Sequence, residues 1–326
     1  MTTTTTPSHP TPPHGRFADR LATAIKDRRT PSCIGLDPRR ESLPPALAAA
    51  AASDPKALAD IFARFCRDVI DVVAPIVPIV KPQLACFEAI GPHGMTALAD
   101  VIAYARTRNL LVLADGKRGD IGSTAEAYAE GWLAGPWAAD ALTVNPYLGL
   151  DSVEPFVKTA DARGAGIFVL VKTSNPGSKD FQDLRCDGKT NYEHVAAGVE
   201  QLAVRTASGG RFGAVGAVVG ATWPKQLDDL RAAMPHTWLL VPGFGRQGGR
   251  ASDVRSAFHA DGMGAIIVSA RDVIFAHARP EMNAGLADGQ WQTAVDRACR
   301  DMIDRLAADT PAAALLADRG QASPGA

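Results

Sequence analysis

Three charged side chains of alternating sign, Asp115, Lys117 and Asp120, directly follow the apolar run LLVLA at 110–114. Side chains two positions apart on a strand point to the same face, so Asp115 and Lys117 are expected to lie together. A carboxylate beside an ammonium group favours the charged form of that group. The pattern therefore predicts a fixed cation of the kind that stabilises negative charge developing on a substrate.

Charged residues also close two earlier apolar runs, with Asp37 after SCIGL and Lys81 after PIVPIV. Taken singly, each such charge is explained equally well as the first solvated residue of a loop. In a barrel of parallel strands, however, catalytic groups come from the C-terminal ends of several strands. Asp37 and Lys81 are therefore candidate site residues together with the pair at 115 and 117.

These residues need a framework of strands whose ends meet, and the sequence contains eight short apolar runs. The runs cover 32–37, 75–81, 110–117, 141–145, 166–173, 213–221, 238–243 and 264–270. Helical periodicity is found between them, for example at 55–74, 94–109 and 191–208. Alternating apolar strands and helices indicate a parallel sheet covered by helices, and eight units predict an α/β fold, the (β/α)8 TIM barrel. An open, doubly wound sheet of eight strands is the alternative.

The chain is long enough for one large core, with 326 residues of which 46% are hydrophobic. A barrel of about 250 residues fits within this length, and no linker-like segment divides the interior. We therefore expect a single catalytic domain over 16–308, a disordered Thr/Pro-rich tail over 1–15 and a flexible tail over 309–326. The connection at 177–192 is long, and long connections in compact domains are commonly functional or mobile.

Charge and hydropathy argue against several classes of protein. The formal net charge is -1, whereas nucleic-acid binders normally show a basic excess. No apolar run approaches the roughly 18 residues that span a bilayer. The N-terminal residues lack the apolar core of a secretory signal. We therefore expect a cytoplasmic protein that binds neither nucleic acid nor membrane.

Cysteine and histidine spacing gives no sign of a metal site. The five cysteines are scattered without a CxxC pair, and the seven histidines form no HxH or HxxxH cluster. Neither a zinc site nor a disulfide framework is therefore expected. No motif typical of a pyridoxal or thiamin cofactor is found either. The sequence thus predicts an enzyme with no metal and no organic cofactor.

A glycine-rich loop late in the chain is suited to binding phosphate. PGFGRQGG at 242–249 places Gly243, Gly245 and Gly248 in G-x-G-x-x-G spacing after the seventh run, and Arg271 follows the eighth. Backbone N–H groups and a guanidinium bind phosphate well, and the last two loops of a barrel commonly form such a site. A purely structural turn is the alternative. A dinucleotide site is less favoured, because the loop belongs to the seventh unit rather than the first.

The segment KTSNPGS at 172–178 ends the fifth apolar run with Ser174, Asn175 and a Pro-Gly pair. Asn, Pro and Gly are typical of turns, so backbone conformation alone is a sufficient explanation. The functional alternative is that the Ser174 hydroxyl and nearby backbone amides bind the edge of a heterocyclic base.

The segment DGKRGDIGST at 115–124 resembles the D-x-K-x-x-D-I-x-x-T motif of the orotidine 5′-phosphate decarboxylase family in full. CIGLDPR and VKPQLACFE are similar to the first-strand and second-strand motifs of that family, the latter in its longer, bacterial branch. TSNPGS, PGFGRQGG and VSARDVIFA resemble its pyrimidine loop, phosphate loop and final phosphate-binding arginine. The resemblance covers about residues 17–280. It implies a (β/α)8 barrel that converts orotidine 5′-phosphate to uridine 5′-phosphate in pyrimidine biosynthesis without a cofactor.

The resemblance also implies a role for each matching residue. The charged network that catalyses decarboxylation would be Lys81, Asp115, Lys117 and Asp120. Asp120 and Thr124 would reach into the site of a neighbouring subunit, which implies a homodimer with shared active sites. The remaining substrate ligands would be Asp37 for the ribose hydroxyls, Ser174 for the pyrimidine, and Gln247, Gly248 and Arg271 for the phosphate.

Loss of CO2 from C6 of the orotate ring would leave a vinyl carbanion without an electron sink. A fixed Lys117 ammonium near C6 is expected to stabilise this carbanion and then to protonate C6, with Asp115 beside the departing carboxylate. Two alternatives stay open. One is a Mg2+-dependent sugar-phosphate decarboxylase or aldolase of the same barrel superfamily, for which E-x-K-x-x-D is expected instead of a motif starting at Asp115. The other is a non-catalytic nucleotide-binding barrel.

Overall fold

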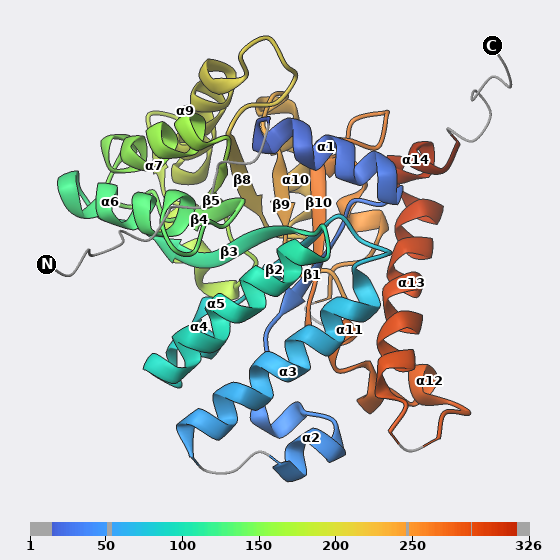
Figure 1. The fold of residues 1–326 in the computed structure, drawn as a ribbon. Helices are drawn as coiled ribbons and strands as arrows, with labels where there is room; N and C mark the ends of the chain where they lie inside the picture. The colour runs from blue at the N-terminus through green and yellow to red at the C-terminus, as the bar shows by residue number, and fades with distance from the viewer. Residues whose placement is uncertain (1–14, 51–53, 246–247, 288, 318–326) are drawn as a thin grey trace, which may run out of the picture.

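The computed structural model describes residues 15–50, 54–245, 248–287 and 289–317. Within them, eight parallel strands form a closed barrel in the order β1-β10-β9-β8-β5-β4-β3-β2 (Figure 1). The strands are β1 (Ser32–Leu36), β2 (Ile79–Pro82), β3 (Leu111–Arg118), β4 (Ala141–Val144), β5 (Gly166–Lys172), β8 (Val215–Val219), β9 (Leu239–Val241) and β10 (Ala265–Ser269). The predicted (β/α)8 barrel is confirmed, and the pairing of β1 with β10 excludes the open sheet.

Each of the eight predicted strands is present, but the second begins later than the sequence indicated. Its apolar run starts at Pro75, whereas β2 starts at Ile79. The reason is that the N–H groups of Ile76 and Val77 both donate to the carbonyl of Val73, at 2.9 Å. These bonds extend the preceding helix by a turn, so this part of the run does not pair with a strand.

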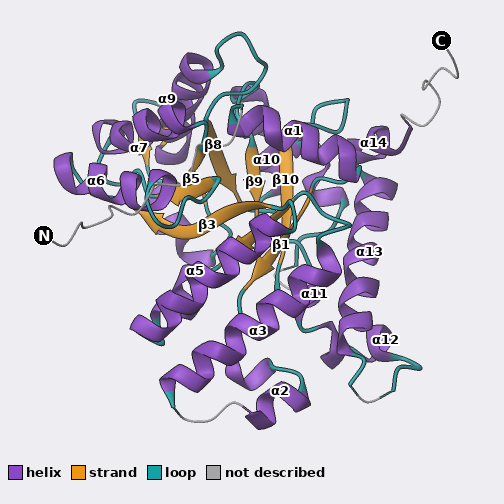
Figure 2. Ribbon diagram, in the orientation of Figure 1, coloured by secondary structure: helices purple, strands orange, loops and turns teal. Residues whose placement is uncertain are grey.

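Helices surround the barrel and connect its strands (Figure 2). The longer ones are α1 (Phe17–Arg28), α3 (Pro55–Val73), α5 (Pro92–Thr107), α6 (Gly122–Ala129), α7 (Leu150–Arg163), α9 (Asn191–Thr206), α10 (Pro224–Ala233) and α13 (Trp291–Asp309). The shorter ones are α2 (Pro45–Ala50), α4 (Leu84–Glu88), α8 (Lys179–Gln182), α11 (Arg271–Ile274), α12 (Pro280–Asn283) and α14 (Ala314–Ala317). Short 3-10 helices occur at Arg40–Ser42, Pro176–Ser178, Ser252–Ala257, Ala276–Ala278 and Pro311–Ala313, and a π-helical turn at Glu130–Ala134.

The hydrophobic core has two parts, because the barrel strands are buried on both faces. One cluster lies between the strands and the surrounding helices, and the other fills the barrel interior. Helix α1 belongs to the interior cluster through Phe17, Leu21 and Ile25. The ring of Phe17 meets that of Phe168 edge to face, with centroids 6.1 Å apart. Helix α1 therefore closes one end of the barrel, which leaves the other end for a site.

The long connection after β5 and the expected C-terminal tail both contain local structure. The long connection after β5 holds helix α8 and a small antiparallel hairpin of β6 (Arg185–Cys186) and β7 (Lys189–Thr190). The chain also continues past the expected end of the domain at 308, and Leu315 of α14 is buried in the interior cluster. The expected flexible tail over 309–326 therefore packs on the barrel as far as α14, and its remainder lies outside the described residues. The tail expected over 1–15 also lies outside them, apart from Gly15.

No helix of the described chain is long and apolar enough to cross a membrane.

Candidate active site

A cavity of about 760 Å3 is formed by residues at the C-terminal ends of the barrel strands. This volume is within the range of small-molecule sites. The lining includes these predicted site residues: Asp37, Lys81, Asp115, Lys117, Ser174 and Arg271. They come from the first, second, third, fifth and last barrel strands and the residues that follow them. The closed barrel thus brings together side chains up to 234 positions apart in the sequence.

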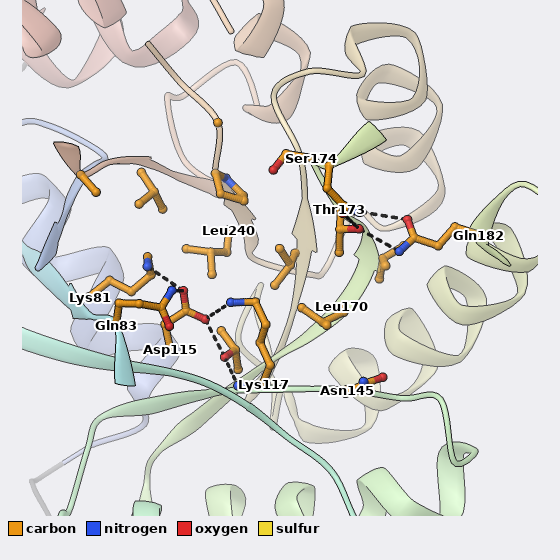
Figure 3. A pocket seen from close by; sticks show the side chains of 18 of the residues that line it. Lys81, Gln83, Asp115, Lys117, Asn145, Leu170, Thr173, Ser174, Gln182 and Leu240 are labelled. Carbon is orange, nitrogen blue, oxygen red and sulfur yellow. Dashed lines mark hydrogen bonds and ion pairs between the residues drawn. The ribbon is translucent and has the colours of Figure 1, made fainter. Parts of the chain in front are cut away.

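The carboxylate of Asp115 lies between two ammonium groups (Figure 3). The Lys81 Nζ is 2.7 Å from Asp115 Oδ2, and the Lys117 Nζ is 2.6 Å from Asp115 Oδ1. Lys81 comes from β2, whereas Asp115 and Lys117 lie two positions apart on β3. The structure therefore forms an alternating row of charges along one wall of the cavity.

Burial and neighbouring charges shift the pKa values of Asp115 and Lys81 in opposite directions. Asp115 is 6% exposed and Lys81 is 5% exposed. Burial raises the pKa of Asp115, but the two ammonium groups outweigh it and hold that pKa well below its ordinary value. Burial lowers the pKa of Lys81, but Asp115 and Asp37 outweigh it and hold that pKa above its ordinary value. At neutral pH Asp115 is therefore a carboxylate and Lys81 an ammonium.

The backbone of Lys117 adopts an uncommon conformation. Its φ is +47°, in the left-handed region that residues other than glycine rarely adopt. The pairing of β3 with β4 shifts register between Ala114 and Arg118. The Lys117 N–H leaves the strand ladder and donates to Thr143 Oγ1 at 2.8 Å. This strain, of about 1–3 kcal/mol, persists because its surroundings hold the lysine in place.

Two uncharged residues that sequence reasoning missed complete the shell around Asp115. Thr143 Oγ1 donates to Asp115 Oδ1 at 3.0 Å, and Gln83 Nε2 donates to Asp115 Oδ2 at 3.0 Å. Gln83 stands two positions after Lys81, so strand alternation was the available signal for it. Thr143 stands near the end of the fourth apolar run, where a lone threonine is unremarkable. With four donors, the orientation of the Asp115 carboxylate is set before any ligand binds.

The other side of the cavity holds Ser174, two residues beyond β5. The Thr222 hydroxyl donates to the Ser174 carbonyl at 3.0 Å. The preceding residue, Thr173, donates its N–H to Gln182 Oε1 at 3.0 Å and accepts from the Trp223 indole N–H at 2.8 Å. The backbone around Ser174 is therefore held in position, and its side chain lines the cavity (Figure 3).

The glycine-rich loop and Arg271 lie beyond β9 and β10. Gly243, Gly245 and Gly248 have φ values of +99°, +83° and +98°, which glycine adopts without strain. Gly243 and Arg271 line the cavity, and among the described residues no carboxylate pairs with the Arg271 guanidinium. Gly248 is exposed and is not among the lining residues. Gln247 lies outside the described residues.

Asp37, Asp120 and Thr124 differ in their surroundings. Asp37 lines the cavity, and its Oδ1 is buried without a hydrogen-bond partner among the described residues. Asp120 instead accepts the N–H of Ile121 at 2.8 Å and is not part of the lining. Thr124 is exposed on α6. The structure therefore brings Asp37 to the cavity of its own chain, but not Asp120 or Thr124.

Comparison with known proteins assigns the family. The model of the orotidine 5′-phosphate decarboxylase / HUMPS family matches residues 30–284. The chain belongs to this family. The resemblance seen in the motifs of the sequence is thereby confirmed.

Relatives within the orotidine 5′-phosphate decarboxylase / HUMPS family match most of the chain. The orotidine 5′-phosphate decarboxylase of Rhodopirellula baltica is 51% identical over 297 residues, covering 89% of this chain and 98% of that protein. The enzyme of the same name from Deinococcus radiodurans is 46% identical over 261 residues, covering 80% of this chain and 89% of that protein.

Solved structures within the family agree with the fold. A putative orotidine-monophosphate-decarboxylase from Toxoplasma gondii superposes with a TM-score of 0.77 at 31% identity, covering 93% of this chain and 99% of that one. A putative orotidine 5′-phosphate decarboxylase from Streptomyces avermitilis superposes with a TM-score of 0.74 at 36% identity, covering 90% of this chain and 96% of that one.

Proposed function

We propose that this protein decarboxylates orotidine 5′-phosphate to uridine 5′-phosphate in pyrimidine biosynthesis. The observation that carries the proposal is the Asp115 carboxylate held between two ammonium groups, at 2.6 and 2.7 Å, on the wall of the cavity. Relatives named orotidine 5′-phosphate decarboxylase match 89% and 80% of this chain, which supports the same substrate. The cytoplasmic location expected from the sequence stays a prediction.

The proposed reaction proceeds by direct loss of CO2 from C6. The electron pair left on C6 is stabilised by the Lys117 ammonium, which then transfers a proton to that carbon. Because Asp115 orients this ammonium before the substrate binds, little reorganisation is needed as charge develops. Asp115 lies beside the departing carboxylate in this proposal. No electron sink from a cofactor enters the reaction.

The remaining lining groups suit the other parts of a nucleotide. The unpartnered Asp37 Oδ1 would accept a ribose hydroxyl, which satisfies an otherwise orphaned buried acceptor. Ser174 would bind the pyrimidine edge. Arg271, with Gly248 and Gln247, would bind the phosphate by charge-assisted hydrogen bonds. Binding energy from this unreactive phosphate can then orient the ring.

Turnover of orotidine 5′-phosphate tests the proposal and separates it from a Mg2+-dependent sugar-phosphate enzyme. We expect purified protein to consume orotidine 5′-phosphate, measured as loss of orotate absorbance, at the same rate with and without a chelator. Loss of activity on chelation would favour the metal-dependent alternative. Binding of uridine 5′-phosphate without any turnover would favour a non-catalytic nucleotide-binding barrel.

We also propose a homodimer in which Asp120 and Thr124 complete the site of the neighbouring subunit. Both residues stand apart from the cavity of their own chain, on or next to α6. Large apolar side chains are exposed on and beside the same helix, including Ile121 at 60% and Tyr128 at 38%. Exposed apolar groups that gather in one region favour a protein interface, and a second copy would cover them.

Mixed dimers of two inactive variants test this arrangement. We expect Lys117→Ala and Asp120→Ala each to be inactive alone, because every site lacks one group. In a dimer of one of each, one site would combine an intact Lys117 with an intact Asp120. Co-expression in equal amounts should restore about a quarter of the wild-type activity, since half of the dimers are mixed and each has one complete site. No recovery in dimers shown to be mixed would mean that Asp120 acts within its own chain.

A further inference from the structure

One lysine is fully enclosed by the protein without belonging to the catalytic row. Lys172, the last residue of β5, has 0% exposure. Strand alternation would direct it with Leu170 into the cavity. However, the pairing of β5 with β8 shifts register between Leu170 and Lys172. Leu170 lines the cavity and Lys172 does not, so this irregularity turns the ammonium away from the substrate space.

The partners of this ammonium come from the connection that follows β5. The Lys172 Nζ lies 2.5 Å from Asp183 Oδ1 and 3.2 Å from Ser178 Oγ. The rings of Trp223 and Tyr192 flank it, with centroids 4.8 and 5.5 Å from Nζ. Enclosing an ammonium is costly unless it is paired and hydrogen-bonded, so these contacts are the condition for its burial.

The connection, residues 176–190, buries few side chains and is held mainly by polar contacts, among them hydrogen bonds of Gln182 with Thr173 and of the Phe181 carbonyl with Asn191. Of its residues, all of which the structure describes, only Ser178 and Thr190 are buried. Its two large apolar side chains, Phe181 and Leu184, are 64% and 60% exposed. Segments with few buried apolar contacts open locally at low free energy. The position of this segment therefore depends strongly on its polar contacts, of which the pair to Lys172 is enclosed on the barrel side.

The same segment forms part of the cavity wall. Phe181 and Gln182 both line the cavity. Gln182 accepts from the Thr173 N–H at 3.0 Å, and its Nε2 donates to Thr173 Oγ1 at 2.9 Å (Figure 3). Thr173 directly precedes Ser174, the proposed pyrimidine ligand. A contact that places Gln182 therefore acts on the groups that would meet the base.

We propose that Lys172 is a positioning residue that holds the 176–190 segment against the barrel and thereby sets the affinity for the substrate. The proposal rests on the proposed decarboxylase function. Without the ion pair to Asp183, the segment samples open conformations, and the substrate must order it on binding. That ordering weakens apparent affinity. The chemistry is unaffected, because the row of Lys81, Asp115 and Lys117 comes from β2 and β3.

Lys172→Met tests this positioning role, because methionine removes the ion pair but keeps an unbranched apolar side chain between the two aromatic rings. Asp183, the carboxylate left without its ammonium partner, is 35% exposed at its side chain and can be hydrated, so the melting temperature should change little. We expect amide hydrogen exchange in 176–190 to rise about tenfold or more. We expect KM for orotidine 5′-phosphate to rise about tenfold with kcat within about twofold of wild type. The matched control is Lys225→Met, which removes an exposed lysine paired with Asp229 at 3.2 Å. It should change neither hydrogen exchange in 176–190 nor KM.

Variants of Asp183, the ion-pair partner of Lys172, keep the test decisive if Lys172→Met fails to fold. Asp183→Asn removes the charge but keeps a side-chain oxygen that can accept from the Lys172 ammonium, and Ser178 Oγ at 3.2 Å also remains, so the variant should fold and raise both hydrogen exchange and KM. Asp183→Glu, which retains the charge, should restore most of the affinity. A lowered melting temperature with unchanged exchange and KM would reduce Lys172 to a purely structural role and overturn the proposal. A wild-type protein without turnover would refute the decarboxylase function instead, while hydrogen exchange would still report on the positioning role of Lys172.

Discussion

Replacement of Lys117 with alanine is expected to abolish measurable turnover while nucleotide binding is retained. The variant loses the ammonium that would stabilise the C6 carbanion and protonate it. Removing a single preorganised electrostatic group of this kind lowers kcat by about 10²–10³-fold, and loss of the proton donor adds about 10²–10⁴-fold. The measurements are loss of orotate absorbance for turnover and titration with uridine 5′-phosphate for binding.

The fold should survive this substitution. The Lys117 side chain is 46% exposed, and Asp115 keeps hydrogen bonds from Lys81, Gln83 and Thr143. Lys117→Arg is the matched variant that keeps the positive charge. It should not restore turnover, because guanidinium does not release a proton near neutral pH. Turnover at the wild-type rate in Lys117→Ala would refute the role assigned to this lysine.

Asp115→Asn is expected to impair both stability and catalysis. The substitution removes the carboxylate from two ammonium groups, one of which, Lys81, is 5% exposed. Breaking a buried pair by removing one partner typically lowers the free energy of unfolding by about 3–5 kcal/mol. Turnover should also fall, since Lys117 loses the group that orients it. Urea denaturation and the orotate assay measure the two effects.

The stability difference between wild type and Asp115→Asn should depend on pH in a defined direction. The pKa of Asp115 is held below its ordinary value in the folded protein. The contribution of Asp115 to the free energy of unfolding is therefore fully present above the unfolded pKa, about 3.9. It is lost as pH falls through the lower folded pKa, so the difference between wild type and Asp115→Asn should shrink in acid. The exposed pair of Asp71 and Arg108 provides the control, because Asp71→Asn should cost less than about 1 kcal/mol. An equal decrease in the free energy of unfolding in Asp115→Asn and Asp71→Asn would show that Asp115 and Lys81 do not form a buried pair.

Much of the architecture could be predicted because its signals are local. Each strand shows as a short apolar run, and the helices predicted at 55–74, 94–109 and 191–208 show as a 3.6-residue repeat. Both signals depend on neighbouring residues alone. The closure of the barrel could not be read in this way. It requires hydrogen bonds between β1 and β10, for example the pairing of Ser32 with Ile267. Periodicity within a run says nothing of which distant run is its neighbour, so closure rested on the number of units and the family resemblance.

The sequence by itself determined the charged candidates, because Asp115 and Lys117 are two positions apart and strand geometry places such side chains on one face. Tertiary structure alone decided that Lys81 shares the same carboxylate, and that the uncharged Gln83 and Thr143 complete its shell. It also decided that Lys172 points away from the cavity, against the alternation expected for its strand. The physical reason is that register shifts and contacts between strands arise only when distant segments pack, whereas side-chain direction within a regular strand follows from the backbone itself.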